Sequence, residues 1–296
     1  MLTRRQFNQM ALASLSAPLT SARVDSTIGG VRIGVQSYSF RDRPLDAMIK
    51  DMVALGLGTC ELWQGHVEPR LPDDYGKPSD DARKRGELRK WRETVSMKEF
   101  ADIGRKFRNA GIELHAYDYS FRDDFSESEI ARGFEMARTL GVKFMVASST
   151  LSMARRLDPL AGKAGIRIGM HGHSNTSDPN EFSSPESFER VLAQCSPNIG
   201  VALDIGHFLA AGGDPVAFLN KHHDRIYMVH LKDRKKNQGL NRPWGRGDTP
   251  IREVLQMLKT RKYPLPAEIE YAYQGADTVA EMRTCFDYCK RILAGS

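Results

Sequence analysis

Short runs of β-branched and other apolar residues alternate with longer amphipathic segments from residue 31 onward. The predicted strands are VRIGVQSY (31–38), GTCELW (58–63), GIELHAY (111–117), GVKFMVA (141–147), GIRIGMH (165–171), NIGVALD (198–204), RIYMVHL (225–231) and PAEIEYA (266–272). The segments between them repeat their apolar residues at helical spacing, which predicts helices. These helices span residues 45–56, 96–111, 126–141, 151–165, 184–196, 214–223, 249–262 and 278–293. Many end at a glycine just before the next strand, as helix C-termini commonly do.

Eight strand-then-helix units predict an α/β protein with a (β/α)8 barrel, the TIM barrel, because their number and the chain length match that fold. We place this domain at residues 23–296. An open doubly wound sheet is the alternative. That fold would need a glycine-rich phosphate loop after its first strand, and GVQSYSFRD (34–42) does not supply one.

One connection, residues 64–96, is much longer than the usual loop after a barrel strand. Long loops of this kind form lids over the catalytic face in barrels, but they also occur as solvated surface excursions. The sequence leaves both interpretations open.

The composition is that of an ordinary globular protein, with 41% hydrophobic and 27% charged residues in a chain of 296. The net charge is +6, but basic and acidic residues are interleaved, so we expect no nucleic-acid partner. Beyond the N-terminus no stretch approaches the roughly 18 uninterrupted apolar residues that a membrane-spanning helix needs. The four cysteines lack CxxC spacing and are expected to be small buried hydrophobes.

Residues 1–22 have the pattern of a twin-arginine signal peptide. Arg4 and Arg5 precede Phe7, a weakly apolar run follows at residues 10–19, and a small-x-small site closes the segment at residues 20–22. The alternative is an ordinary amphipathic helix. We therefore expect an exported, periplasmic protein. Phosphorylated sugars are scarce outside the cytoplasm, so export disfavours them as substrates.

Polar residues gather at the predicted C-terminal ends of the strands, where the active site of a barrel lies. Every histidine except His222 and His223 falls there or just beyond. The strand-end residues are Gln36, Glu61, His66, His115, His171, His173, Asp204, His207, His230, Lys232 and Glu270. Gathering so many titratable groups around one axis is unfavourable unless they bind something. A single divalent ion would satisfy them, and mixed His, Asp and Glu ligands suit Mn, Zn, Co or Fe.

These strand ends match the motifs of a known family. HGHSNTS (171–177), LDIGHF (203–208), VHLKD (229–233), EIEY (268–271), ELWQGH (61–66) and WGRGDTPI (244–251) resemble the xylose-isomerase-like sugar isomerase/epimerase superfamily. The resemblance covers the chain from GVQSYSF (34–40) onward. It implies a metal-binding TIM barrel that acts on a small carbohydrate.

The resemblance also implies the metal ligands. Asp204, His230 and Glu270 match the family's ligands from the sixth, seventh and eighth strands, whereas His171 stands where the family usually has an acidic residue. In the family's epimerases that residue is one of two carboxylates that exchange a proton across the substrate. A branch with His-x-His at this position includes proteins resembling inosose dehydratases and lyases that act on 3-keto-glycosides.

The first expected function is therefore a metal-dependent isomerase or epimerase of a non-phosphorylated sugar, working through an enediolate. The alternative is a lyase or dehydratase that acts on a keto-glycoside or an inosose-like substrate. An abasic-site nuclease would need further metal ligands and a basic groove, and a sugar-binding protein without catalysis stays possible. The sequence leaves the oligomeric state open.

Roles for individual residues complete these expectations. His173, two residues beyond a ligand, is the first candidate for the general base, because an imidazole titrates near neutral pH. Glu270 would serve as ligand and second base, and Lys232 would polarise or protonate a substrate oxygen. The candidate substrate-binding residues are Gln36, Arg41, Glu61, His66 and His207. The candidate stacking aromatics, which equally suit plain packing, are Tyr38, Phe40, Trp63 and Trp244.

Overall fold

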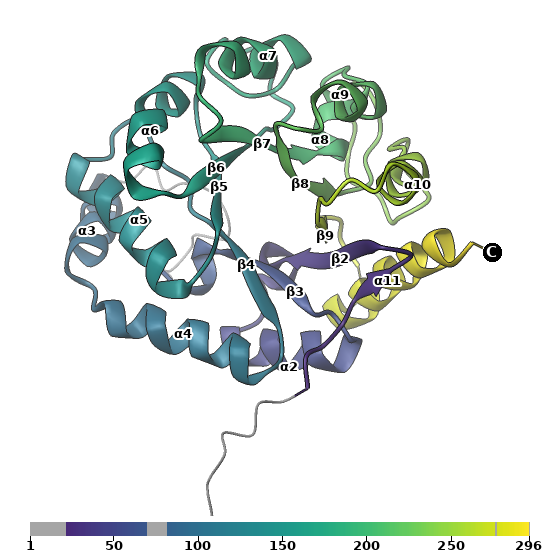
Figure 1. Ribbon diagram of the computed structural model, residues 1–296, viewed down its shortest axis with the longest axis horizontal. Coiled ribbons are helices and arrows are strands. Elements are labelled where there is room, and N and C mark those ends of the chain that lie inside the picture. The colour runs from purple at the N-terminus through teal and green to yellow at the C-terminus, as the bar shows by residue number, and fades with distance from the viewer. Residues whose placement is uncertain (1–21, 70–81, 276, 296) are drawn as a thin grey trace, which may run out of the picture.

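Eight parallel strands close into a barrel in the computed structural model, which describes residues 22–69, 82–275 and 277–295 (Figure 1). The barrel strands are β2 (Val31–Gln36), β3 (Thr59–Trp63), β4 (Glu113–Asp118), β5 (Phe144–Ser148), β6 (Arg167–His171), β7 (Ile199–Asp204), β8 (Ile226–Leu231) and β9 (Ala267–Ile269). Each pairs with the next, and β2 pairs with β9 to close the ring. The predicted TIM barrel and all eight predicted strands are confirmed. A short additional strand, β1 (Thr27–Ile28), pairs antiparallel with β2.

The predicted helices form a ring outside the barrel (Figure 1). They are α2 (Leu45–Leu55), α4 (Met97–Asn109), α5 (Glu127–Leu140), α6 (Leu151–Ala164), α7 (Pro185–Gln194), α9 (Pro215–His222), α10 (Ile251–Arg261) and α11 (Thr278–Ala294). Gly56, Gly141 and Gly165 adopt the left-handed conformation directly after α2, α5 and α6, as the strand-preceding glycines predicted.

Three short elements and one helix of ordinary length were not predicted. They are η1 (Ser37–Phe40), η2 (Gln64–His66), α3 (Ala82–Thr94) and α8 (Ile205–Ala210). The α3 sequence ARKRGELRKWRET has too few apolar residues to show a helical stripe. The six-residue α8 is too short to show a period, but Asp204 caps its N-terminus by accepting a hydrogen bond from the backbone N–H of His207.

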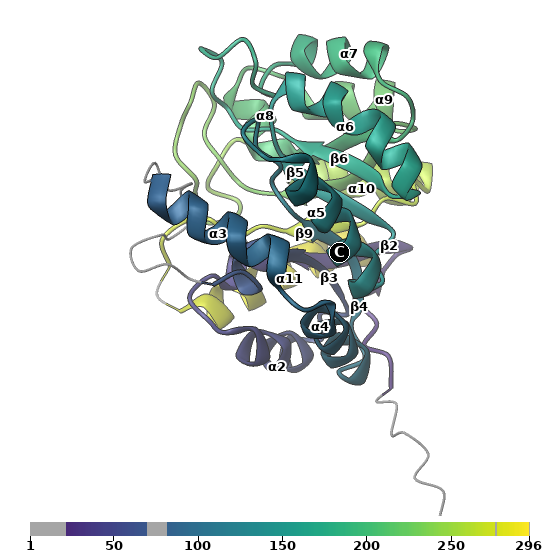
Figure 2. The same ribbon diagram turned by 90° about the vertical axis from the view of Figure 1, so that its left-hand side faces the viewer.

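In the described part of the long connection (residues 64–96), helix α3 packs alongside α5 on the outside of the barrel (Figure 2). The guanidinium of Arg92 on α3 is buried, and its Nε lies 2.7 Å from Oε1 of Glu68. The same group lies 3.4 Å from a carboxylate oxygen of Glu129 on α5. These ion pairs fix residues 82–94 beside the strand ends. Residues 70–81 of the same connection lie outside the described residues.

The remaining expectations on composition agree with the fold where they fall on described residues. Cys60, Cys195, Cys285 and Cys289 are free thiols and are buried. Within residues 22–69, 82–275 and 277–295, none of the helices has the length and apolar character needed to cross a bilayer. The expected signal peptide falls on residues 1–22, of which 1–21 lie outside the described residues.

Candidate active site

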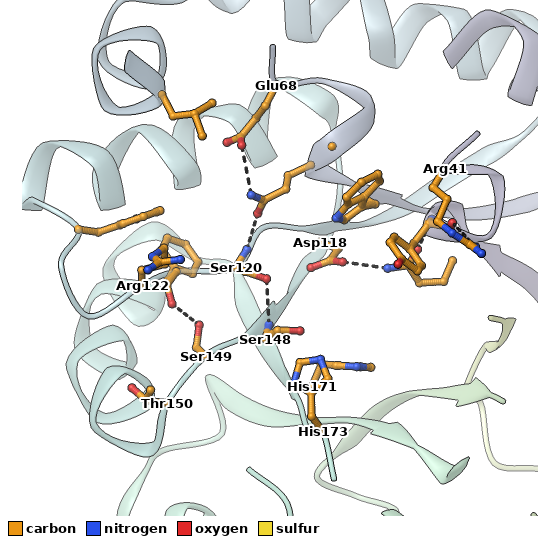
Figure 3. A pocket seen from close by; sticks show the side chains of 18 of the residues that line it. Arg41, Glu68, Asp118, Ser120, Arg122, Ser148, Ser149, Thr150, His171 and His173 are labelled. Atoms are coloured by element: carbon orange, nitrogen blue, oxygen red, sulfur yellow. Dashed lines mark hydrogen bonds between the residues drawn. The ribbon is translucent and has the colours of Figure 1, made fainter. Parts of the chain in front are cut away.

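A cavity of about 1330 Å³ opens at the C-terminal ends of the strands, where the barrel fold predicts the active site. Its deep end is lined by side chains that follow β6 to β9, and its outer part extends over the ends of β4 and β5 to α3. Figure 3 shows this outer row, with Ser120, Ser148 and Ser149 near Asp118 and His171. Polar side chains therefore line the cavity at both ends, among apolar ones such as Trp63 and Phe125.

Four predicted metal ligands meet at the deep end. One potential ligand atom from each of His171, Asp204, His230 and Glu270 lies within 4.8 Å of all the others, and we call this set the four-residue cluster. The strand register brings these side chains together, because Asp204 on β7 pairs directly with His230 on β8. Glu270 follows β9 and its backbone N–H bonds to the carbonyl of Leu231.

The four-residue cluster fits a divalent ion. Nδ1 of His171 and Nδ1 of His230 face each other at 2.8 Å, and Oε2 of Glu270 is buried without a hydrogen-bond partner in the described structure. Two imidazole nitrogens and two carboxylates form a donor set that suits Zn, Mn, Fe or Co. The four residues are the ones that would hold the ion.

Glu61 lies behind His230 rather than in the cavity lining. Its side chain is fully buried, and its Oε2 lies 2.5 Å from Nε2 of His230, which leaves Nδ1 of that ring turned toward the four-residue cluster. A carboxylate in this place orients a metal-binding imidazole. Glu61 was expected to bind substrate, but it does not line the cavity, and its place behind His230 suits a partner of that ring instead.

Lys232 sits between two of the carboxylates. Its Nζ lies 2.9 Å from Oδ2 of Asp204 and 2.8 Å from Oε1 of Glu270. Burial opposes the ammonium form, but the two carboxylates outweigh it and raise the pKa of Lys232. Burial likewise opposes ionisation of Asp204, yet the cationic Lys232 lowers the pKa of Asp204 well below its ordinary value.

The two cluster histidines differ in charge when no ion is bound. Burial lowers the pKa of His171 well below its ordinary value, and the nearby His230 lowers it further. Burial acts on His230 in the same direction, but the carboxylate of Glu61 outweighs it and raises the pKa of His230 to about 9. A metal would therefore displace a proton from His230.

Two further predicted residues, His173 and His207, lie in the cavity lining beside His171. Nδ1 of His173 lies 3.2 Å from a carboxylate oxygen of Glu181. Nδ1 of His207 lies 2.6 Å from Nη1 of Arg234. Burial, followed by the charge of Lys232, lowers the pKa of His207 well below its ordinary value, so its ring is neutral.

Gln36 and Arg41 lie on the opposite wall. Nε2 of Gln36 donates to Oδ2 of Asp118 at 2.8 Å, and its Oε1 accepts from the backbone of Tyr38. The guanidinium of Arg41 packs over the rings of Tyr38 and Tyr271 and donates to the carbonyl of Tyr271. Both residues line the cavity, as expected for substrate contacts.

His66 does not line this cavity. Its Nδ1 is 3.1 Å from Oγ of Ser37, its Nε2 is 3.2 Å from the carbonyl oxygen of Phe40, and it borders a separate hollow of about 270 Å³. The expectation that His66 binds the substrate of the main cavity is corrected by this placement.

The predicted stacking aromatics divide into two pairs. Tyr38 and Trp63 line the cavity. Phe40 is fully buried in the core, and Trp244 packs edge-to-face on Tyr288 away from the cavity. For Phe40 and Trp244 the plain packing interpretation is the correct one.

Sequence reasoning missed Asp118, which ends β4 and lines the cavity. The apolar pattern predicts that the strand ends at Tyr117 and makes His115 its polar residue. His115 instead lies inside the barrel, 3.3 Å from Glu268, where burial lowers its pKa to about 3. Burial and the nearby Glu61 raise the pKa of Asp118 well above its ordinary value. In a regular strand, side chains two residues apart point the same way, so the inward His115 would predict an inward Tyr117 and not Asp118. The register of β3 against β4 shifts at this point, and the sequence does not show that shift.

Comparisons with known proteins agree with this geometry. The family model described as "Xylose isomerase-like TIM barrel" matches residues 49–290. An inosose dehydratase of Lactiplantibacillus plantarum is 32% identical over 80 residues, 27% of this chain and 25% of the relative. The chain thus aligns with about a quarter of the length of the curated relatives it matches.

Two solved structures share the fold. An uncharacterised protein from Parabacteroides distasonis has a TM-score of 0.62 at 23% identity, covering 88% of this chain and 99% of its own. The IolI protein, whose structure contains a zinc atom, has a TM-score of 0.64 at 16% identity, with coverages of 89% and 98%. With most of its length matched by one family model and the barrel closed as that model describes, this chain belongs to the xylose isomerase-like TIM barrel family.

Proposed function

We propose that this protein is a divalent-metal-dependent lyase that eliminates water or an aglycone from a cyclic keto-sugar, either inosose-like or a 3-keto-glycoside. The observation that carries the proposal is His171. It lies on β6, the fifth strand of the barrel, and belongs to the four-residue cluster. At this position the site therefore has an imidazole in place of the carboxylate that a symmetric epimerase would use. Relatives named inosose dehydratase support the same type of reaction.

The cluster and Lys232 would stabilise the charge that develops on the substrate. A divalent ion held by the four-residue cluster would polarise a ketone and stabilise negative charge on its oxygen. The ammonium of Lys232 lines the cavity and stays charged between Asp204 and Glu270, so it can donate a hydrogen bond to a substrate oxygen.

His173 would act as the base. Its Nδ1 faces the carboxylate of Glu181, so that nitrogen carries the proton and Nε2 is free to accept one from the carbon beside the ketone. The electron pair of that C–H bond enters the enolate. It then forms the new C=C bond as the C–O bond at the next carbon breaks.

Asp118 is placed to act as the acid. Its Oδ1 is buried without a hydrogen-bond partner in the described structure, and burial and the nearby Glu61 raise its pKa, which favours the protonated form of the carboxyl. It would give its proton to the departing oxygen, so that water or an alcohol leaves. An elimination needs one base and one acid of this kind, rather than two equivalent bases.

An isomerase or epimerase is the second candidate. Glu270 belongs to the four-residue cluster and also lines the cavity, and burial raises its pKa. A carboxyl group with such a pKa could carry a proton between neighbouring carbons of a sugar. The family's general character favours this reaction, and the test below separates the two.

The test incubates the purified, metal-loaded protein in deuterated water with ketoses, an inosose and 3-keto-glycosides, followed by mass spectrometry. The proposal expects loss of water or of the aglycone, and it expects Asp204→Asn to lose this activity. Deuterium in a product of otherwise unchanged composition would instead establish the isomerase. Binding without turnover or exchange would indicate a sugar-binding protein and overturn both.

A further inference from the structure

A second group of potential ligands lies directly beside the four-residue cluster. One ring nitrogen from each of His171, His173 and His207 lies within 4.8 Å of the others, and we call this set the three-histidine cluster. The rings of His173 and His207 lie 5.1 Å apart between centroids and almost perpendicular, at 78°. By composition this is a three-imidazole metal site, but its hydrogen bonds indicate something else.

The partner of His207 determines where its proton lies. Nη1 of Arg234 is 2.6 Å from Nδ1 of His207. A guanidinium has donors only and keeps its proton in proteins, so Nδ1 must be the acceptor of this hydrogen bond. An imidazole that accepts at Nδ1 is neutral and carries its one proton on Nε2. His207 therefore presents an N–H group from Nε2.

This tautomer cannot ligate a metal through Nε2. A ligating imidazole uses a lone pair on one nitrogen and keeps its proton on the other, whose hydrogen bond commonly goes to an acceptor. At His207 the other nitrogen, Nδ1, already faces the N–H of Arg234. Ligation at Nε2 would remove the last proton of the ring or bring two N–H groups against each other.

Arg234 is held in place by its own contacts. Its Nε and Nη2 donate to the carbonyl oxygen of Gly239 at 3.1 and 2.7 Å, and its Nη1 also lies 3.0 Å from Oγ of Ser174. Its backbone N–H donates to Oγ1 of Thr249. The guanidinium is thus fixed on three sides and cannot turn away from His207 without losing several hydrogen bonds.

His173 has the opposite arrangement. Its Nδ1 faces a carboxylate oxygen of Glu181, which only accepts, so the proton lies on Nδ1 and Nε2 offers a lone pair. Two adjacent imidazoles therefore carry opposite tautomers, one set by an anion and the other by a cation.

We propose that Arg234 is a positioning residue that fixes His207 as an Nε2–H hydrogen-bond donor and keeps the three-histidine cluster from binding a second metal. In the proposed function, the Nε2–H group of His207 would then face a substrate oxygen beside the lone pair of His173. This contact with substrate rests on the proposed function. The tautomer and the metal stoichiometry do not depend on it.

The tautomer is tested by long-range proton–nitrogen NMR on metal-free protein labelled with 15N-histidine, with His207→Gln used to assign the signals. We expect an unprotonated Nδ1 and a protonated Nε2 for His207. Arg234→Lys, which keeps a donor-only cation, should preserve this pattern, and Arg234→Met should lose it. A proton on Nδ1 of His207 in the unmutated protein would overturn the proposal.

Metal stoichiometry gives an independent measurement. Each protein is titrated with zinc alone, followed by calorimetry and by metal analysis after desalting. We expect one tightly bound ion per chain in the unmutated protein and a second in Arg234→Met. Lys235→Met is the matched control, because Lys235 is the next residue and its ammonium pairs with Asp248. Two ions in the unmutated protein, or one ion in a folded Arg234→Met, contradict the proposal.

These outcomes are distinct from failure of the proposed function. If no substrate is turned over, the lyase is rejected while the tautomer and stoichiometry results still stand. If Arg234→Met does not fold, as judged by circular dichroism, the spectrum of the unmutated protein and that of Arg234→Lys still decide the question.

Discussion

At the scale of single residues, the carboxylate of Glu61 contacts a member of the four-residue cluster from outside the cavity lining. It is fully buried and lies 2.5 Å from Nε2 of His230. We predict that Glu61→Gln lowers metal affinity about 10- to 100-fold, because carboxylate partners of this kind hold the ligand ring and raise its basicity. Competition with a metal indicator measures the change. An affinity within about twofold of the unmutated protein would show that Glu61 has no such role.

His115 predicts an acid-sensitive stability. Its pKa is lowered to about 3 by burial, so the folded protein keeps the ring neutral while the unfolded chain protonates it below about pH 6.5. The unfolded state then binds more protons, and stability falls as the pH drops from about 6.5 toward 3. Between pH 7 and pH 5 we expect His115→Gln to lose roughly 2 kcal/mol less stability than the unmutated protein.

Urea unfolding at the two pH values checks this prediction. His223→Gln is a suitable control, because it also removes an imidazole, but one that is exposed on the surface. An acid-induced loss of the same size in His115→Gln and in the unmutated protein would assign that loss to other groups.

The four-residue cluster could be predicted from the sequence because each of its members sits at a strand end inside a family motif. Asp118 could not, since its strand runs one residue beyond its apolar pattern. Glu181 and Arg234 come from irregular loops, where no periodicity places a side chain. Their roles follow only from which atoms they face.

At the scale of elements, α3 is held by a buried ion-pair network as well as by Trp91, which packs against the core. Arg92 is 5% exposed and pairs with both Glu68 and Glu129. Removing one partner from a buried ion pair leaves unpaired charge in the interior. We therefore predict that Arg92→Met destabilises the protein by about 3–5 kcal/mol.

Denaturant unfolding measures this effect, and Arg105→Met provides the control. Arg105 pairs with Asp102 on the surface of α4, and exposed pairs of this kind contribute about 0–1 kcal/mol. Equal effects of the two substitutions would mean that the buried network does not hold α3.

The same contrast explains which elements the sequence predicts. The barrel strands are buried on both faces and appear in the chain as short apolar runs, and the outer helices repeat their buried apolar residues about every 3.6 positions. α3 packs through Trp91 and through Arg92 with its carboxylates, and charged residues read as exposed in such a pattern. Its position on the cavity wall therefore needed the structure.

At the scale of the whole molecule, the N-terminal residues predict export. We expect a fusion of residues 1–30 to a reporter protein to reach the periplasm of a bacterium with twin-arginine transport, because that receptor reads the arginine pair. Replacing Arg4 and Arg5 by lysine should retain the reporter in the cytoplasm, as measured by cell fractionation. Equal export of both fusions, or of neither, contradicts the prediction.

Metal binding should also stabilise the whole barrel. The four-residue cluster draws its members from β6, β7, β8 and the segment after β9, so an ion there links four consecutive strand ends that are separate in the unfolded chain. An ion that binds only the folded state at 100 times its Kd adds about 2.7 kcal/mol. For a domain of this size that corresponds to an increase in Tm of about 5–10 °C.

Thermal unfolding with and without zinc or manganese measures this shift, and a chelator should reverse it. Asp204→Asn is the matched control, because it removes one anionic ligand while preserving the size of the side chain. It should unfold at the same temperature with or without the ion. An equal increase in Tm for both proteins would place the ion elsewhere, and then the strand ends would converge on something other than a metal.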